Sequence, residues 1–220
     1  MTDILRLADA DLSRLARSIQ NEIERRTRAA ASDAGIVIWA QEMAKRALTV
    51  AAAGRHSILF VGSPGCGKTM LRALGLQIGV TQSYEARWCP CGRFNDPTAD
   101  CKCSSAKITL HVRRWPVAEI TVEVPPVPFR DRNPRWQGRS LEDIRKQIEG
   151  VEPVDGAIAD DAYRNLMKAA AAELGLTTEE QVTIEKIART IAGLDHAAAV
   201  GPSHLCEAIN YRAIRRSLRD

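Results

Sequence analysis

Apolar residues in the first part of the chain recur at steps of three and four. Between residues 4 and 30, leucine, isoleucine and alanine follow this spacing, and charged residues occupy most positions between them. This period places the apolar side chains on one face of an amphipathic helix. We therefore predict that residues 1–34 form an N-terminal helical arm that docks on another surface.

A second helical pattern leads into a short strand. Apolar positions from Trp39 to Leu48 keep the helical spacing, and the pattern stops at Gly54. Residues 57–61 are an apolar run of the kind that forms a buried strand. Helical spacing resumes over residues 70–80, after a turn rich in glycine. The order of helix, strand, loop and helix is half of an α/β nucleotide-binding unit.

The middle of the chain, residues 84–139, is rich in cysteine, proline and arginine. It contains one predicted strand, over residues 119–124, and the prolines that follow predict a stiff, extended exit. The rest of the chain is helical in pattern. We predict helices near residues 140–149, 158–174, 177–193 and 203–218.

Two of these helices begin with the spacing of a capping box. Ser140 with Asp143, and Thr177 with Glu180, place a hydroxyl and a carboxylate three residues apart at a predicted helix start. The last predicted helix carries Cys206 among apolar neighbours. We predict that this cysteine is buried in the core.

The composition is that of an ordinary globular protein. Of the 220 residues, 45% are hydrophobic and 26% are charged, which excludes disordered, collagen-like and disulfide-scaffold classes. The net charge of +4 is too small to indicate a nucleic-acid partner by itself. No apolar run approaches the roughly 20 residues that cross a bilayer, and the first residues lack the order of a signal peptide. We predict a cytoplasmic protein without a membrane partner.

The strongest motif is a phosphate loop that matches G-x-x-x-x-G-K-[ST] between a predicted strand and a predicted helix. It consists of Gly62, Ser63, Pro64, Gly65, Cys66, Gly67, Lys68 and Thr69. The glycines let backbone N–H groups face phosphate oxygens, Lys68 reaches the outer phosphates, and the Thr69 hydroxyl can hold Mg²⁺. We predict that this loop binds ATP or ADP with Mg²⁺. The alternative is a plain strand-to-helix turn, and Cys66 occupies a spacer position.

ATP hydrolysis needs further groups, and the sequence has no clear motif for them. An apolar strand that ends in paired acids would hold Mg²⁺ and aim water, and an arginine would reach the γ-phosphate. The nearest candidate strand, residues 157–161, has one large apolar residue and leads into a predicted helix, so that its acids fit a helix cap better. Nucleotide binding is therefore predicted more firmly than turnover.

Four of the six cysteines fall within 15 residues, in two C-x-C pairs. The four are Cys89, Cys91, Cys101 and Cys103. In a cytosolic protein such a cluster indicates a metal sooner than a disulfide, and four thiolates suit a closed structural Zn²⁺ site. Free thiols, a redox pair and an iron–sulfur cluster are the alternatives. Arg87, Arg93 and Lys102 are candidate donors to the thiolates.

These motifs and the residues around them resemble the magnesium-chelatase-type AAA+ ATPases, especially the competence-associated ComM-like branch. Residues 41–54, followed by the phosphate loop, look like the opening of that family's ATPase core. Residues 89–104 and 122–125 follow the order of the same branch, and residues 187–194 and 204–208 resemble the start and end of its helical lid. Together these segments cover most of residues 36–216.

The resemblance implies an α/β fold with two parts after the predicted arm. Residues 35–135 would form a reduced P-loop AAA+ core that contains a cysteine-rich zinc insertion, and residues 136–220 would form a C-terminal helical lid. The family also implies ATP or ADP with Mg²⁺ as ligands. AAA+ ring partners or further copies of the chain are the expected protein partners.

Departures from the family pattern indicate that hydrolytic parts are missing. Only 19 residues separate Thr69 from Cys89, which leaves no room for the strand that carries the Walker B acids in relatives. The family's sensor asparagine falls on Arg87, its arginine finger on Val117, and its lid arginine on Glu179. The resemblance therefore implies an ATP-binding protein with weak or absent hydrolysis.

Two other functions stay open. One is an active ATPase completed in an oligomer or acting in DNA processing, with Mg²⁺ and water positioned by residues such as Glu85 or Glu123. The other is a zinc-stabilised nucleic-acid-binding module, because residues 107–139 carry an excess of arginine, with Trp115 and Trp136 interleaved as base stacking requires. A decayed fragment of a larger ATPase is a further interpretation.

Overall fold

The computed structural model describes residues 38, 40–94, 96, 99–128, 139–155 and 161–216. The chain divides into two units, Met1–Ile36 and Val37–Asp220, and every described residue belongs to the second unit. The predicted N-terminal arm lies outside the described residues.

A three-stranded parallel sheet forms the centre of the second unit. Its strands are β1 (Ile58–Val61), β2 (Ser83–Ala86) and β3 (Ile120–Glu123), in the order β2-β1-β3. The middle strand, β1, is apolar and fully buried, as expected for a parallel strand that is covered on both faces. Because all three strands run in one direction, their carboxyl ends meet at one edge, and the phosphate loop leaves β1 at that edge.

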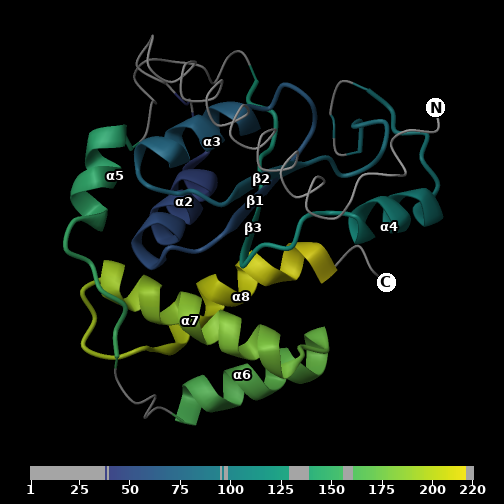
Figure 1. Cartoon of the computed structure of the whole chain (residues 1–220). Coiled ribbons are helices and arrows are strands. Elements are labelled where there is room, and N and C mark those ends of the chain that lie inside the picture. Colours follow the sequence, from purple (N-terminus) through teal and green to yellow (C-terminus); the bar gives the residue numbers. More distant parts are fainter. Residues whose placement is uncertain are drawn as a thin grey trace, which may run out of the picture. The chain divides into compact units, whose positions relative to one another are not determined.

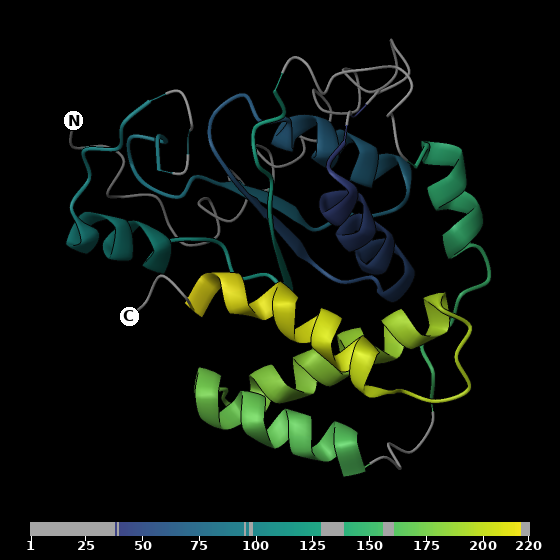
Figure 2. The ribbon, with the colours of Figure 1, turned by 180° about the vertical axis from the view of Figure 1, so that it is seen from behind.

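Seven helices surround the sheet in the described part of the chain (Figure 1). They are α2 (Glu42–Gly54), α3 (Lys68–Gln77), α4 (Ser105–Arg113), α5 (Leu141–Ile148), α6 (Asp161–Leu174), α7 (Thr178–Leu194) and α8 (Pro202–Arg216). Helix α2 packs on β1 and β3, α3 packs on β2, and α8 packs on β3 and on α6 and α7. Figure 2, the view from behind, shows α4 and α5 on opposite sides of the sheet, as Figure 1 does.

The segment that carries the four clustered cysteines, residues 87–104 and here called the cysteine-rich segment, covers one face of the sheet together with α4. Leu59 and Val61 of β1 pack into a buried cluster that also contains Trp88, Cys89, Ile108, Val112, Trp115 and Ala118. Alternate residues of a strand point to opposite faces, so that Ile58 and Phe60 point toward the other side, where α2 packs. The segment that carries the candidate metal ligands is therefore part of the hydrophobic core.

The predicted helix starts are confirmed where the structure describes them. At the start of α5 the Ser140 side chain accepts from the Asp143 backbone N–H and the Asp143 side chain accepts from the Ser140 N–H. Thr177 and Glu180 form the same reciprocal pair at the start of α7. The two capping boxes therefore fix the ends of these helices, as the sequence predicts.

Two elements were not predicted, and one burial prediction was wrong. Strand β2 and helix α4 lie in the stretch for which we expected a single strand. Cys206 was expected in the core, but it is exposed, because α8 turns Leu205 and Ala208 inward and Cys206 to solvent. In the part of the chain that the structure describes, no helix is both long and apolar enough to cross a membrane.

Candidate functional site

The predicted phosphate loop connects the carboxyl end of β1 to the first turn of α3. Gly65 and Gly67 have φ angles of +78° and +100°, in the left-handed region that favours glycine. A side chain at Gly62 would lie 2.3 Å from the backbone oxygen of Val124, because the end of β3 passes close to the start of the loop. The motif glycines therefore allow both the turn and this close packing.

Lys68 is folded against its own loop. Its side chain is buried, and its Nζ donates to the carbonyl oxygens of Gly62, at 3.0 Å, and Ser63, at 2.8 Å. It also lies 3.5 Å from the buried Cys66 Sγ. Lys68 is the first residue of α3, where backbone N–H groups lack partners within the helix and the helix dipole is positive. The loop therefore brings the Lys68 ammonium group and the N-terminus of α3 to one point.

A cleft of about 850 Å³ lies beside this loop. Its wall is formed by Pro64, Gly65, Gly67, Lys68, Thr69, Met70, Glu85, Ala86, Arg87, Pro90, His111, Arg114, Trp115 and Pro116. Three of these side chains, Lys68, Arg87 and Arg114, are cationic, and one, Glu85, is anionic. The excess of positive charge, with a helix N-terminus at its edge, suits an anionic ligand such as phosphate.

Helices α5 to α8 contribute no described residue to this cleft. Glu179, which the family resemblance places opposite the γ-phosphate, is exposed in the first turn of α7. Val117, at the family's arginine-finger position, is 78% exposed. Neither of these two residues lines the cleft beside the phosphate loop in this structure.

Glu85 and Glu123, the two acids of the active-ATPase hypothesis, have different surroundings. Glu85 lies on β2 and accepts a hydrogen bond from Thr69 Oγ1 at 3.2 Å. Glu123 lies at the end of β3 and lines a second cavity of about 760 Å³, between the start of α2 and α8. Only the pairing of β2 with β1 brings Glu85 to the loop, and sequence spacing alone carries no signal of that pairing.

The four clustered cysteines converge. Their sulfur atoms all lie within 4.8 Å of one another, and the Cys89 Sγ lies 3.2 Å from that of Cys91 and 3.6 Å from that of Cys101. Four thiolates around Zn²⁺, each at about 2.3 Å, would be about 3.8 Å apart in a tetrahedron. The cluster could therefore hold one metal ion without a large rearrangement.

The thiol pKa values show why a cation suits this cluster. The backbone N–H of Arg93 and a hydrogen bond with Cys89 lower the pKa of the Cys91 thiol to about 6. For Cys101, the Cys103 backbone N–H lowers the pKa, but desolvation and the neighbouring thiols raise it more, to about 12. Cys91 thus ionises readily, whereas the ionisation of Cys101 is disfavoured by burial and by the neighbouring thiols. A bound divalent cation would instead favour the thiolate form of all four cysteines.

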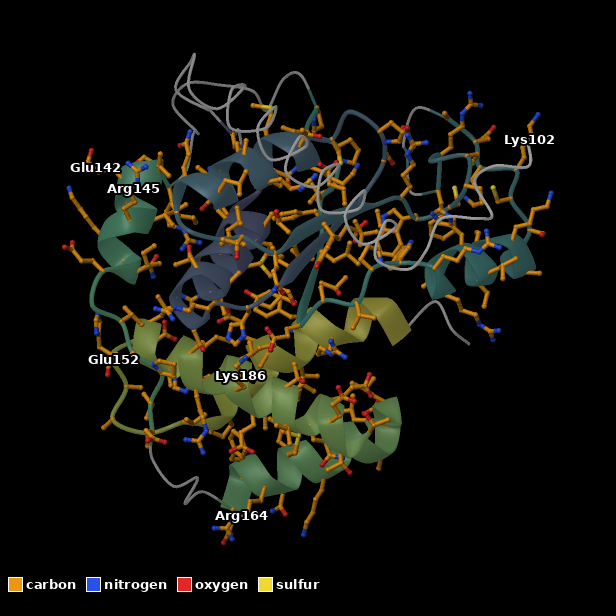
Figure 3. The ribbon with its side chains drawn as sticks, in the orientation of Figure 1. Lys102, Glu142, Arg145, Glu152, Arg164 and Lys186 are labelled. Atoms are coloured by element: carbon orange, nitrogen blue, oxygen red, sulfur yellow. The ribbon has the colours of Figure 1, made fainter. Side chains whose placement is uncertain are left out.

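Of the three candidate donors near the cysteines, Arg93 contributes through its backbone N–H. Figure 3 shows Lys102 at the outer edge of the cysteine-rich segment, with its side chain pointing outward. The third candidate, Arg87, lines the phosphate cleft.

The cysteine-rich segment also contacts the phosphate loop. Gly92, with a φ angle of +77°, lies so close to Pro64 that an added Cβ would be 2.9 Å from the proline ring. The carbonyl oxygen of Arg87 accepts a hydrogen bond from Trp115 Nε1 at 3.1 Å and lies 3.0 Å from His111 Nε2. The cysteine-rich segment and the phosphate loop are therefore joined by direct packing of Gly92 on Pro64.

The structure removes one support of the nucleic-acid interpretation. Trp115 is buried, with 5% of its surface exposed, and its ring packs edge-on against Trp88 at 5.7 Å. A base stacks on an exposed ring face, and the burial of Trp115 counts against its expected role in stacking. Trp136 and the arginines at 130, 132 and 135 lie outside the described residues.

Comparisons with known proteins match two regions of the chain, one before and one after the cysteine-rich segment. The family model for magnesium chelatase, subunit ChlI, matches residues 36–86, and the model for its C-terminal part matches residues 131–212. Residues 87–130, which hold the cysteine-rich segment, lie between the two matched regions. These matches imply the P-loop AAA+ class for this α/β fold.

Two curated proteins are similar over parts of the chain. Competence protein ComM of Haemophilus influenzae is 68% identical over 34 residues, which are 16% of this chain and 7% of that protein. The Escherichia coli protein YifB, described as uncharacterized, is 31% identical over 130 residues, which are 50% of this chain and 24% of that protein. The chain belongs to the magnesium chelatase ChlI/ComM-like family. The matched parts span less than a quarter of these two relatives.

Proposed function

We propose that this protein binds ATP or ADP, with Mg²⁺, through residues 62–69 and hydrolyses ATP weakly or not at all. The observation that carries the proposal is the cationic cleft beside the first turn of α3, with Lys68 and Thr69 on its wall. Family membership supports the same ligand, because the ChlI/ComM-like family suggests AAA+ ATP binding. The proposal assigns the outer phosphates to Lys68 and the backbone N–H groups of the loop.

The residues present fit a magnesium nucleotide. Ser63 Oγ is buried and has no hydrogen-bond partner within the described part of the chain. Its hydroxyl can therefore still form a hydrogen bond with a ligand of the loop. The Thr69 hydroxyl lies on the cleft wall and offers an oxygen of the type that Mg²⁺ prefers. When bound, Mg²⁺ would neutralise part of the phosphate charge.

The composition of the cleft wall supports the proposal of weak hydrolysis. Among the described residues of that wall, Glu85 is the one carboxylate, and it is already engaged by Thr69 and Arg72. A second acid to activate water is not among them. An active ATPase would therefore need groups beyond the described residues of this wall, for example from another chain, and this stays the alternative.

We also propose that Zn²⁺ bound by Cys89, Cys91, Cys101 and Cys103 stabilises the fold. The four sulfur atoms converge, and Cys89 is part of the core cluster that covers the sheet. A metal bound there would cross-link the two ends of the cysteine-rich segment and add its binding free energy to folding.

Calorimetric titration with ATP and ADP tests the proposed function. We expect Lys68→Ala to weaken ATP binding about tenfold to hundredfold, because the charge of the outer phosphates loses its ammonium partner. Lys168→Ala, at an exposed lysine on α6, is the matched control and should bind ATP like the parent. Equal ATP affinity of Lys68→Ala and the parent would refute the assignment.

Assembly and location are further proposals. The family suggests oligomerisation, and we propose a self-oligomer or a ring with fuller AAA+ relatives, in the cytoplasm. Light scattering of the purified chain with and without Mg²⁺ and ATP tests self-assembly. A monomer under both conditions would leave only assembly with other chains. DNA binding is a weaker proposal, because Trp115, one of the two tryptophans expected to stack on bases, is buried.

A further inference from the structure

Glu85 is held at a position from which a carboxylate can reach a ligand of the phosphate loop. It lies on β2, the neighbour of β1, where its backbone is in register with Phe60. Its side chain lines the cleft together with Lys68 and Thr69 and is 25% exposed. The acid is thus half-buried, next to the loop and open to the ligand space.

The hydrogen bond between Thr69 and Glu85 has a direction that matters. Thr69 Oγ1 donates its proton to Glu85 Oε2 at 3.2 Å. A hydroxyl that donates in this way keeps its lone pairs for another partner. A hard cation beside Thr69 would therefore meet a hydroxyl oxygen and a carboxylate, the oxygen ligands that Mg²⁺ takes in proteins.

Arg72 holds the same carboxylate from the other side. Its Nη1 lies 3.3 Å from Glu85 Oε1, and its Nε donates to Ser83 Oγ at 3.4 Å. Thr69 and Arg72 are three residues apart and therefore share a face of α3. Glu85 is thus fixed between two side chains of one helix, and the pairing with Arg72 limits the cost of keeping its charge half-buried.

We propose that Glu85 positions Mg²⁺ beside Thr69 when a nucleotide is bound. The inference rests on the proposed nucleotide-binding function and adds the residue that makes this binding depend on the cation. A purely structural tie between β2 and α3 would give the same contacts in the absence of nucleotide, so that stability alone cannot distinguish the two roles.

The test compares ATP affinity with Mg²⁺ and with EDTA by calorimetry. In the parent we expect Mg²⁺ to tighten ATP binding by about tenfold or more, the effect of one charge-assisted contact. Glu85→Gln keeps the shape and a hydrogen-bond acceptor but removes the charge, and should reduce the ratio of the two affinities to about threefold or less. Glu85→Ala, which removes the whole carboxylate, should have the same effect and serves if Glu85→Gln folds poorly.

Glu173→Gln is the matched control, because Glu173 is an exposed glutamate on α6, a helix that contributes no described residue to the cleft. It should keep the parental ratio. Retention of the parental ratio by Glu85→Gln, or a parent whose ATP affinity does not depend on Mg²⁺, would overturn the inference and leave the proposed function intact. A parent that binds ATP under neither condition would instead refute the proposed function.

Discussion

Individual glycines fix how the cysteine-rich segment meets the phosphate loop. Gly92 and Gly79 both have positive φ angles, +77° and +88°, but an added Cβ at Gly92 would press on Pro64 whereas one at Gly79 would meet open space. Non-glycine residues in this backbone region cost about 1–3 kcal/mol. An alanine would therefore meet backbone strain at both positions, but it would press on a neighbouring residue only at position 92.

Substitution by alanine separates these two effects. We expect Gly92→Ala and Gly79→Ala each to lower the free energy of unfolding by about 1–2 kcal/mol, because both residues keep a left-handed backbone. Only Gly92→Ala should also weaken ATP binding, since its Cβ displaces Pro64 at the start of the loop. Denaturant unfolding and ATP titration of both variants check this, and equal ATP affinities would show that the contact is not coupled to the loop.

His56 is a buried residue whose protonation depends on folding. It lies 2.9 Å from Thr190 Oγ1 and 3.2 Å from Glu119 Oε2. Burial lowers the pKa of His56, more than the nearby Glu119 raises it, and Lys186 lowers it further. The unfolded chain, with a histidine pKa of about 6.5, therefore binds the proton more readily than the folded chain.

Stability should consequently fall as the pH drops below about 6.5, toward the lowered pKa of folded His56. We expect the melting temperature to decrease between pH 7.5 and pH 5.5, and to decrease less in His56→Gln, which does not titrate. His196→Asn, at an exposed histidine, controls for the loss of a histidine. The expectation fails if His56→Gln and the parent lose stability equally over this range.

At the scale of elements, the cysteine-rich segment and α4 replace the helices that usually cover the second face of a parallel sheet. Trp88 and Trp115 of this layer lie over Leu59 and Val61. The layer is built from a short helix and a loop with little regular structure, so that its order depends on side-chain packing. A metal that joins the two cysteine pairs would supply the missing cross-link.

Metal removal should therefore melt this layer. We expect about one zinc per chain in protein prepared without chelator, and a Cys101→Ser variant with less zinc and a lower melting temperature. Cys206→Ser, at the exposed cysteine on α8, should leave both unchanged. Zinc-free protein, or a Cys101→Ser variant that melts like the parent, would contradict a structural metal site.

Elements with a regular local signal could be predicted from the sequence. The apolar run of β1 and the two capping boxes depend on residues that are close in the chain, and the structure has them where expected. Strand β2 buries only Ser83, and α4 buries only Ile108 and Val112. Such short elements form because β2 pairs with β1 and because α4 packs on the two tryptophans. Contacts between residues so far apart in the chain leave no local pattern in the sequence.

The candidate sites divide in the same way. The phosphate loop and the four cysteines are contiguous motifs that sequence spacing identifies. The contact of Glu85 with Thr69, and that of Gly92 with Pro64, join residues from different elements. They follow from the pairing of β2 with β1 and from the packing of the cysteine-rich segment, which the sequence alone did not predict.

At the scale of the whole described unit, ion pairs hold the C-terminal helices to the core away from the phosphate cleft. Arg46 of α2 pairs with Asp195 and with Glu207 of α8. Arg212 of α8 donates to the backbone oxygen of Ala118 at 2.8 Å, and Lys186, labelled on α7 in Figure 3, pairs with Glu119. These contacts keep α7 and α8 against the start of β3.

The position of α7 changes what we expect of Glu179. The family resemblance predicts that Glu179→Arg tightens ATP relative to ADP, whereas the structure has Glu179 exposed and outside the cleft wall. In the isolated chain we therefore expect this substitution to leave the ratio of ATP and ADP affinities unchanged. A ratio that rises severalfold would show that α7 moves to the nucleotide.

A single time course tests whether the chain holds ATP and whether it turns ATP over slowly. The purified chain is mixed with equimolar labelled ATP and Mg²⁺, and bound nucleotide and released phosphate are followed together. We predict about one ATP bound per chain in the parent, lost in Lys68→Ala, with phosphate release far below the roughly 1 to 10³ s⁻¹ common for enzymes. Absence of bound nucleotide, or phosphate release faster than about 1 s⁻¹ that vanishes in Lys68→Ala, would contradict this prediction.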